Sequence, residues 1–230
     1  MAETAVTRTG GRGRFISFEG GEGSGKSTQI KMLAERLAAV KLQTIVTREP
    51  GGSPGAEIIR HLVLSGMGKL LGPEAETLLF AAARDDHART VIEPALKRGV
   101  WVLSDRFSDS TRVYQGALGK VSPEILNAMQ RVTIGDLKPD LTVILDVPVE
   151  IGLNRAAARR GTAAADRFES EDVKFHQQLR EAYRQIAANE PERCVLIDAT
   201  QEPDQVAASV WAALRDRFFT AAADSTASSA

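Results

Sequence analysis

The stretch GGEGSGKST, residues 20–28, carries the residue types that bind the phosphates of a nucleotide. Its spacing is G-x-x-x-x-G-K-S/T, in which glycines let backbone amides turn toward phosphate oxygens. In this spacing Lys26 would reach the β- and γ-phosphates, and the hydroxyl of Ser27 would be a ligand of Mg²⁺. The predicted triphosphate-binding residues are Gly20, Gly21, Glu22, Gly23, Ser24, Gly25, Lys26, Ser27 and Thr28.

The elements on either side of this stretch are the ones that such a loop needs. An apolar strand is predicted at residues 14–19 (RFISFE), and a helix is predicted over TQIKMLAERL, residues 28–37. The N-terminus of that helix would add its positive end to the phosphate site. Because motif and context agree, a glycine-rich turn without a ligand is the weaker interpretation.

Four further apolar runs predict the rest of the fold. They cover residues 43–49, 100–105, 140–147 and 193–199, and their near-continuous Val and Ile content is typical of strands covered on both faces. Helical patterns separate them, with one apolar face formed by Ile30, Leu33 and Leu37 and another formed by Ile58, Ile59, Leu62 and Val63. The alternation predicts an α/β fold with a parallel sheet and right-handed crossovers.

Ligands of a parallel sheet bind at the carboxyl ends of its strands. Arg48 ends the second predicted strand in TREPGG, and Asp105 and Arg106 end the third in SDRFSDS. Asp105 could complete the shell of a metal ion opposite Ser27, and two arginines beside a triphosphate suggest an acceptor that itself carries phosphate. Taken singly, each arginine is better explained by a surface salt bridge; at matching strand ends, ligand binding is favoured. The other strand-ending residues are Glu19, Gly20, Glu49, Asp146 and Asp198.

Composition narrows the class of protein. The formal net charge of −1 provides no basic excess for binding nucleic acid. No apolar run is long enough to span a bilayer, and the N-terminus has no apolar signal segment, so we expect a cytoplasmic protein with no membrane partner. The single cysteine, Cys194, is expected to be a buried, inert thiol, and His61, His87 and His176 are expected at the surface. We expect one domain over residues 14–219, with flexible tails at 1–13 and 220–230.

Six motifs occur in an order that resembles the bacterial thymidylate kinases, from about residue 14 to 215. They are GGEGSGKST, TREPGG, LLFAAARDDH, SDRFSDSTRVYQG, KPDLTVILDV and DRFE. The resemblance implies the P-loop fold of the nucleoside monophosphate kinases, with a five-stranded parallel sheet flanked by helices. It also implies transfer of the γ-phosphoryl of ATP to dTMP with Mg²⁺, for dTTP synthesis, by an enzyme that is commonly a homodimer.

The resemblance assigns roles around the acceptor phosphate and sugar. Arg48 and Arg106 would hold the phosphate of dTMP, and Asp105 would lie at the metal. Glu22 would face the 3′-hydroxyl of the sugar, and Tyr114 would lie under the deoxyribose, where a 2′-hydroxyl would clash. The role of Glu49 stays open.

The base pocket is likewise assigned by the resemblance. Phe80 would stack on thymine, Arg84 would hydrogen-bond its O4 atom, and Thr111 and Gln115 would complete the site. From the residues alone, Phe80 in ETLLFAAAR is more often a core residue than a stacking platform. Arg84 follows at i+4 and interrupts the apolar face, which favours a pocket there.

The stretch NRAAARRGTAAADRFESED predicts a mobile lid over about residues 155–169. Its small residues offer few anchoring contacts, and it carries Arg155, Arg159, Arg160 and Arg167. Phosphoryl transfer needs positive charge at the moving group, and the phosphate loop contains no arginine, so the lid is expected to bring one in on closure. Between the neighbours Arg159 and Arg160 the sequence does not decide, and Arg160 is favoured. The predicted catalytic residues are Lys26, Asp105, Arg106, Arg155, Arg160 and Arg167.

Rival functions lack the residues that they require. A GTPase switch would need D-x-x-G and N-K-x-D, and neither occurs in the chain. The segment LSGMG at 64–68 resembles the signature of a transporter ATPase, but it lies too near the phosphate loop. A nucleotide-binding scaffold without catalysis would not need Asp105, Arg106 and the lid. The nearest rival is a P-loop kinase for another small acceptor, and the phosphate-gripping arginines disfavour an unphosphorylated nucleoside.

Overall fold

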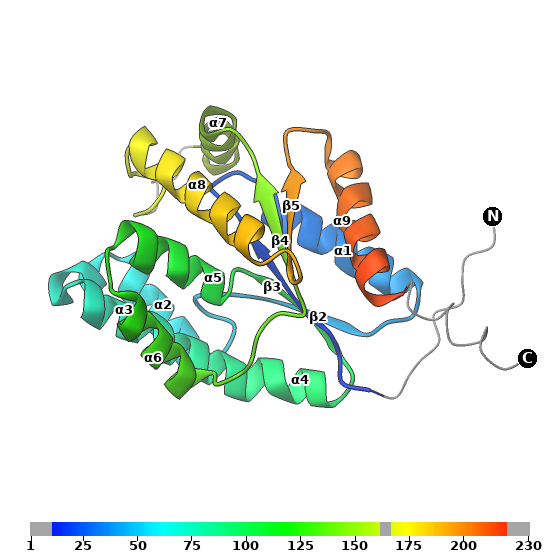
Figure 1. Ribbon diagram of the computed structural model, residues 1–230, viewed down its shortest axis with the longest axis horizontal. Helices are drawn as coiled ribbons and strands as arrows, with labels where there is room; N and C mark the ends of the chain where they lie inside the picture. The colour runs from blue at the N-terminus through cyan, green and yellow to red at the C-terminus, as the bar shows by residue number, and fades with distance from the viewer. Residues whose placement is uncertain (1–10, 162–166, 220–230) are drawn as a thin grey trace, which may run out of the picture.

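The computed structural model describes residues 11–161 and 167–219 (Figure 1). Residues 1–10 of the predicted N-terminal tail (1–13), the predicted C-terminal tail at 220–230 and the centre of the predicted lid, 162–166, lie outside the described residues. Gly13, predicted to belong to the N-terminal tail, is buried and donates its amide hydrogen to the Leu96 carbonyl at 2.8 Å. The folded body therefore starts slightly before the predicted boundary.

A five-stranded parallel sheet forms the centre of the molecule, in the order β2-β3-β1-β4-β5. Its strands are β1 (Phe15–Glu19), β2 (Thr44–Arg48), β3 (Trp101–Asp105), β4 (Leu141–Asp146) and β5 (Cys194–Asp198). All five predicted strands are confirmed, and each begins one residue later than predicted.

Helices cover both faces of this sheet (Figure 1). The helical segments are α1 (Lys26–Ala39), α2 (Pro54–Leu64), η1 (Met67–Leu71), α3 (Pro73–His87), η2 (Ala88–Ile92), α4 (Glu93–Lys97), α5 (Ser108–Thr111), η3 (Arg112–Leu118), α6 (Pro123–Thr133), α7 (Val149–Arg160), α8 (Val173–Asn189) and α9 (Pro203–Phe218). Helices α1 and α9 pack on one face, while η2, α4, η3 and α8 pack on the other.

Local chemistry explains where several helices begin. Helices α2, α3, α6 and α9 each start with a proline, whose missing N–H would have had no partner in the first turn. Helix α8 starts after Asp172, whose side chain accepts a hydrogen bond from the amide of Phe175 at 2.7 Å. These caps set the start of the helices that bear on the site, α3 and α8.

Alternate residues of the strands enter different cores, as expected for a sheet covered on both sides. Phe15 packs with the η2 and α4 layer, whereas its neighbour Ile16 packs with α1 and α9. The apolar face of α1 is confirmed, because Ile30, Leu33 and Leu37 are buried. On α2 the prediction was partly wrong: Val63 is buried, but Ile58 is 73% exposed.

Two of the three histidine predictions were also wrong. His61 is exposed, but His87 and His176 are buried. The buried position of Cys194 is confirmed, and burial raises the pKa of its thiol to about 12. Its inertness stays a prediction. No helix among the described residues is long and apolar enough to cross a bilayer.

Candidate active site

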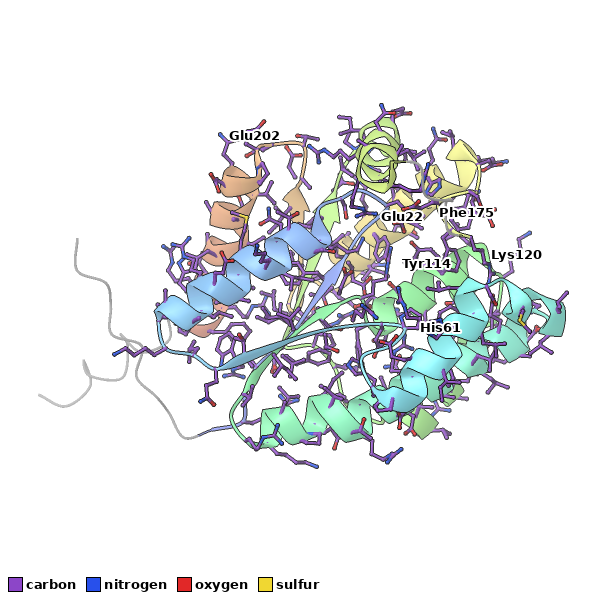
Figure 2. All side chains as sticks on the ribbon, turned by 180° about the vertical axis from the view of Figure 1, so that it is seen from behind. Glu22, His61, Tyr114, Lys120, Phe175 and Glu202 are labelled. Carbon is purple, nitrogen blue, oxygen red and sulfur yellow. The ribbon has the colours of Figure 1, made fainter. Side chains whose placement is uncertain are left out.

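A cavity of about 500 Å³ opens at the carboxyl ends of β1, β2 and β3. In the register of the sheet Asp105 pairs with Phe18 on one side and with Arg48 on the other, so the predicted strand-end residues converge there. Figure 2 shows Glu22, Tyr114 and Phe175 in the same region of the molecule, and Tyr114 contacts both of the others. The predicted site residues that line this cavity are Glu22, Gly23, Ser24, Gly25, Lys26, Ser27, Thr28, Arg48, Phe80, Arg84, Asp105, Arg106, Thr111, Tyr114 and Gln115.

The phosphate loop joins the end of β1 to the start of α1. Gly23 and Gly25 have positive φ angles, and a Cβ atom on Gly23 would overlap the backbone carbonyl of Gly152. The ammonium of Lys26 donates to the carbonyls of Gly20 at 3.1 Å and Gly21 at 3.0 Å, which is how these two predicted residues take part without lining the large cavity. Burial lowers the pKa of Lys26. The Lys26 ammonium is therefore poorly solvated, and a bound phosphate would compensate its charge.

The side chains beside the loop fit a magnesium ion shared with a nucleotide. The hydroxyl of Ser27 donates to Oδ2 of Asp105 at 3.1 Å, so the two candidate oxygen ligands lie together. Within residues 11–161 and 167–219 no cluster of three or more His, Cys, Asp or Glu side chains could hold a metal by itself. Magnesium is usually held by one or two protein oxygens, water and the substrate's phosphates, which agrees with this sparse donor set.

Arg106 is held in the cavity by both its backbone and its side chain. It has a positive φ of 71°, and its amide donates to the Phe18 carbonyl at 2.9 Å. Its guanidinium donates to Oε1 of Glu22 at 2.9 Å and lies 5.1 Å from the ring centre of Tyr114. Burial opposes its charge, but the surrounding tyrosines and carboxylates raise the pKa of Arg106 further above its usual range, so it stays protonated.

Arg48 lies at the rim of the same cavity, and its side chain is less restrained than that of Arg106. Its side chain is 55% exposed and its guanidinium pairs with Glu57 of α2 at 3.1 Å. Since exposed ion pairs contribute little, Arg48 can exchange this partner for a ligand at small cost.

A buried network holds Arg84 at the far end of the cavity. Its Nε atom donates to Oε2 of Glu49 at 2.7 Å, and Nη2 donates to the hydroxyl of Thr111 at 2.9 Å. The other oxygen of Glu49 contacts Nδ1 of His87 at 3.0 Å, and Nε2 of His87 contacts the hydroxyl of Thr47 at 2.7 Å. In the described part of the chain Nη1 of Arg84 has no hydrogen-bond partner.

The four lid arginines have different environments. Arg159 lines the cavity and donates to Oε1 of Glu169 at 3.3 Å, whereas Arg160 donates to Oε2 of Glu169 at 2.6 Å and does not line the cavity. Arg155 points to the loop after β5, where it donates to the Ala199 carbonyl at 2.7 Å. Arg167 pairs with Glu76 on α3. Of the four arginines, the structure brings only Arg159 to the cavity, and the catalytic roles of Arg155, Arg160 and Arg167 stay predictions.

Comparison with known proteins agrees with this arrangement. A sequence model of the thymidylate kinase family matches residues 18–210. The chain belongs to the thymidylate kinase family.

Individual thymidylate kinases are similar along nearly the whole chain. The thymidylate kinase of Bradyrhizobium diazoefficiens is 76% identical over 217 residues, which cover 94% of this chain and 95% of the relative. That of Nitrobacter winogradskyi is 73% identical over 230 residues and covers both chains completely. The crystal structure of thymidylate kinase from Ehrlichia chaffeensis superposes with a TM-score of 0.71 at 31% identity, covering 88% of this chain and 99% of that one.

Sequence reasoning missed several residues of this thymidylate kinase site. Glu19 was noted only as a strand end, yet it is fully buried, and burial together with Asp109 raises the pKa of its carboxyl to about 7. Tyr183 of α8 and Ser110 of α5 both bond to Glu19. A glutamate in an otherwise apolar strand was the only signal in the sequence; nothing near Tyr183 indicated a role.

A second group that the sequence did not assign is Glu49 with His87. His87 lies three residues after Arg84 on α3, and both contact the same carboxylate. The signal was the i, i+3 spacing of Arg84 and His87, which places them on one helical face. Glu49 thus connects the end of β2 to the part of the cavity that Arg84 lines.

Proposed function

We propose that this cavity binds ATP and dTMP together and transfers the γ-phosphoryl group to the acceptor phosphate. ATP-dependent phosphorylation of dTMP to dTDP is the activity of the thymidylate kinase family, to which the chain belongs. One observation carries the residue assignment. A single continuous cavity extends from Lys26 and Ser27 through Arg106 to Arg84.

The donor half uses backbone amides and Lys26. Amides of the loop and the N-terminus of α1 bind the triphosphate, and Lys26 neutralises its β- and γ-phosphates. Ser27 and Asp105 would hold Mg²⁺, which when bound neutralises charge on the phosphate oxygens. Their side chains fit this role because both present oxygen atoms.

The acceptor half uses Arg106 and Arg48. Arg106 holds the phosphate of dTMP, and Arg48 at the rim adds a second contact. An oxygen of that phosphate attacks the γ-phosphorus while the bond to the β–γ bridging oxygen breaks. Charge accumulates on the moving group, so catalysis depends on position and on fixed positive charge.

The far end of the cavity, lined by Phe80 and Arg84, recognises the nucleoside. Nη1 of Arg84 is a charged donor that suits a carbonyl oxygen such as O4 of thymine, while Phe80 supplies the stacking surface. Thr111 and Gln115 complete the base site, and Tyr114 excludes a 2′-hydroxyl. Glu22 faces the 3′-hydroxyl; its pKa is lowered because Arg106 and Lys26 outweigh the effect of burial, so it is an anion.

The assembly and location that we propose follow the family. Large apolar side chains are exposed on α2, α3 and α6, namely Ile58, Leu78 and Val132, and these helices lie on one side of the molecule (Figure 1). A second copy of the chain would cover them, so we propose a homodimer, to be tested by sedimentation equilibrium. We propose a cytoplasmic location.

An acceptor panel tests the proposed function. The protein with ATP and Mg²⁺ is assayed on dTMP, dUMP, dCMP, dAMP and thymidine, with a Lys26→Ala variant as the control for the donor site. We expect the highest kcat/KM with dTMP, no turnover of thymidine, and loss of turnover in Lys26→Ala with the fold intact. Preference for another monophosphate would favour the rival, a P-loop kinase for that acceptor.

A further inference from the structure

We propose that Glu19 is a positioning residue that fixes Arg106 through the hydroxyl groups of Ser110 and Tyr183. The inference rests on the proposed role of Arg106 as the ligand of the acceptor phosphate. It adds Glu19 of β1 and Tyr183 of α8, which do not line the substrate cavity, and Ser110 of α5, which does.

Glu19 ends β1 and is completely buried. Its Oε1 atom accepts the amide hydrogen of Phe107 at 2.8 Å. Its Oε2 atom accepts hydrogen bonds from the hydroxyls of Ser110 at 2.7 Å and Tyr183 at 2.8 Å. One carboxylate therefore restrains the residue that follows Arg106 and two side chains from other elements.

The same two hydroxyls bind the guanidinium of Arg106. Nη1 of Arg106 donates to Oγ of Ser110 at 3.2 Å and to the phenol oxygen of Tyr183 at 3.1 Å. Each hydroxyl has a single proton. The two hydroxyl oxygens also lie 3.0 Å apart. With Glu19 ionised, both protons are directed to its carboxylate, and the lone pairs of both oxygens face Arg106. The carboxylate thereby orients both hydroxyls as acceptors for the arginine.

Arg106 needs such support because its backbone is held in the left-handed region, with φ of 71°. An arginine side chain also loses rotamer freedom when it binds a phosphate, and a fixed guanidinium has already lost it. The network thus prepares Arg106 for the acceptor phosphate before dTMP arrives. Tyr183 lies on α8, the helix that follows the described end of the lid, and it is almost fully buried.

Tyr183→Phe is the informative variant, because it removes one hydroxyl and keeps the ring in the core. We expect the Kd for dTMP to rise about tenfold, since the Arg106 guanidinium loses one of the hydrogen bonds that fix it. Glu19→Gln should raise the Kd for dTMP further, because its amide group would donate toward the two hydroxyls and turn their protons toward Arg106. The matched control is Ser17→Ala, which removes a buried hydroxyl from the same strand but bonds to Thr142 at 2.9 Å, away from Arg106.

Binding calorimetry with dTMP, thymidine and ATP distinguishes a loss of Arg106 positioning from a general disturbance of the fold. For Tyr183→Phe we expect weaker binding of dTMP, with the Kd for thymidine and for ATP changed less than twofold. For Ser17→Ala we expect all three constants to stay near the parent values. Equal losses for thymidine and dTMP in Tyr183→Phe would overturn the proposal, because thymidine lacks the phosphate that Arg106 would bind.

A double-mutant cycle with Arg106→Ala tests the connection itself. If Tyr183 acts through Arg106, adding Tyr183→Phe to Arg106→Ala should cause no further loss of dTMP affinity. Additive losses would overturn the inference while leaving the role of Arg106 intact. Unchanged dTMP affinity in Arg106→Ala alone would instead show that the acceptor site was assigned wrongly, and the inference would fall with it.

Discussion

Removing the carboxylate of Glu49 should destabilise the fold and weaken recognition of the acceptor. Glu49 pairs with Arg84 through a contact of 2.7 Å, and the two side chains are only 4% and 8% exposed. The same carboxylate contacts His87. In Glu49→Ala the guanidinium of Arg84 would keep its charge without its buried counter-ion.

The expected size follows from this burial. Removing one partner of a buried pair costs about 3–5 kcal/mol, because the other charge is left uncompensated. For a domain of this size 1 kcal/mol corresponds to roughly 2–4 °C in Tm, so Glu49→Ala should lower Tm by about 6–20 °C. Glu49→Gln should lose less, on the order of 1.5–3 kcal/mol, because its amide oxygen can still accept from Arg84.

The assay is calorimetric unfolding with and without dTMP, with Glu57→Ala as the matched control. Glu57 pairs with Arg48 at the rim of the same cavity, where both partners are substantially exposed, and it accepts the amide hydrogen of Gly52 at 2.9 Å. Its loss should therefore cost on the order of 1–2 kcal/mol, less than the loss of Glu49. The added stabilisation by dTMP should shrink in Glu49→Ala, since Arg84 would no longer be held against Thr111. Equal Tm losses in the two variants, or dTMP stabilisation unchanged in Glu49→Ala, would refute this reasoning.

Three further outcomes are expected. Arg159→Ala should slow single-turnover phosphoryl transfer more than Arg160→Ala, by up to about 10³-fold, because only Arg159 lines the cavity; the reverse order would favour Arg160, the choice made from sequence. The fold raises the pKa of Glu19 from its ordinary value of 4.5 to about 7, so the folded protein binds this proton more tightly than the unfolded chain. The contribution of Glu19 to stability should therefore fall as the pH rises from 4.5 to about 7. Urea unfolding at pH 5, 6 and 7 should show this decline, by at most about 1.4 kcal/mol per pH unit, and its persistence in Glu19→Gln would assign it to another group. Tyr114→Ala should narrow the preference for dTMP over its ribose counterpart, and an unchanged ratio of kcat/KM would remove Tyr114 from the sugar site.

Much of the fold follows from local patterns in the sequence. The five apolar runs, the phosphate-loop spacing and the helix face of Ile30, Leu33 and Leu37 are all signals within short windows, and the structure confirms them. The convergence of Arg48 and Asp105 also followed, because parallel strands end at one edge of a sheet. The exposure of Ile58 did not follow, since an apolar side chain on a helix faces the core or solvent according to its neighbours.

The hydrogen-bond networks behind the site depended on the tertiary structure. Glu19 and Tyr183 are separated by 164 residues, and Glu49 and His87 by 38, so no local spacing connects them. The neighbours Arg159 and Arg160 likewise differ only in their surroundings: both bind Glu169, but only Arg159 of the two also lines the cavity. By itself the sequence determined the strands, the phosphate loop and the kind of chemistry, because these depend on residue type and short spacing. Only the folded chain decided which buried carboxylates hold Arg84 and Arg106, because a hydrogen bond depends on distances that packing alone sets.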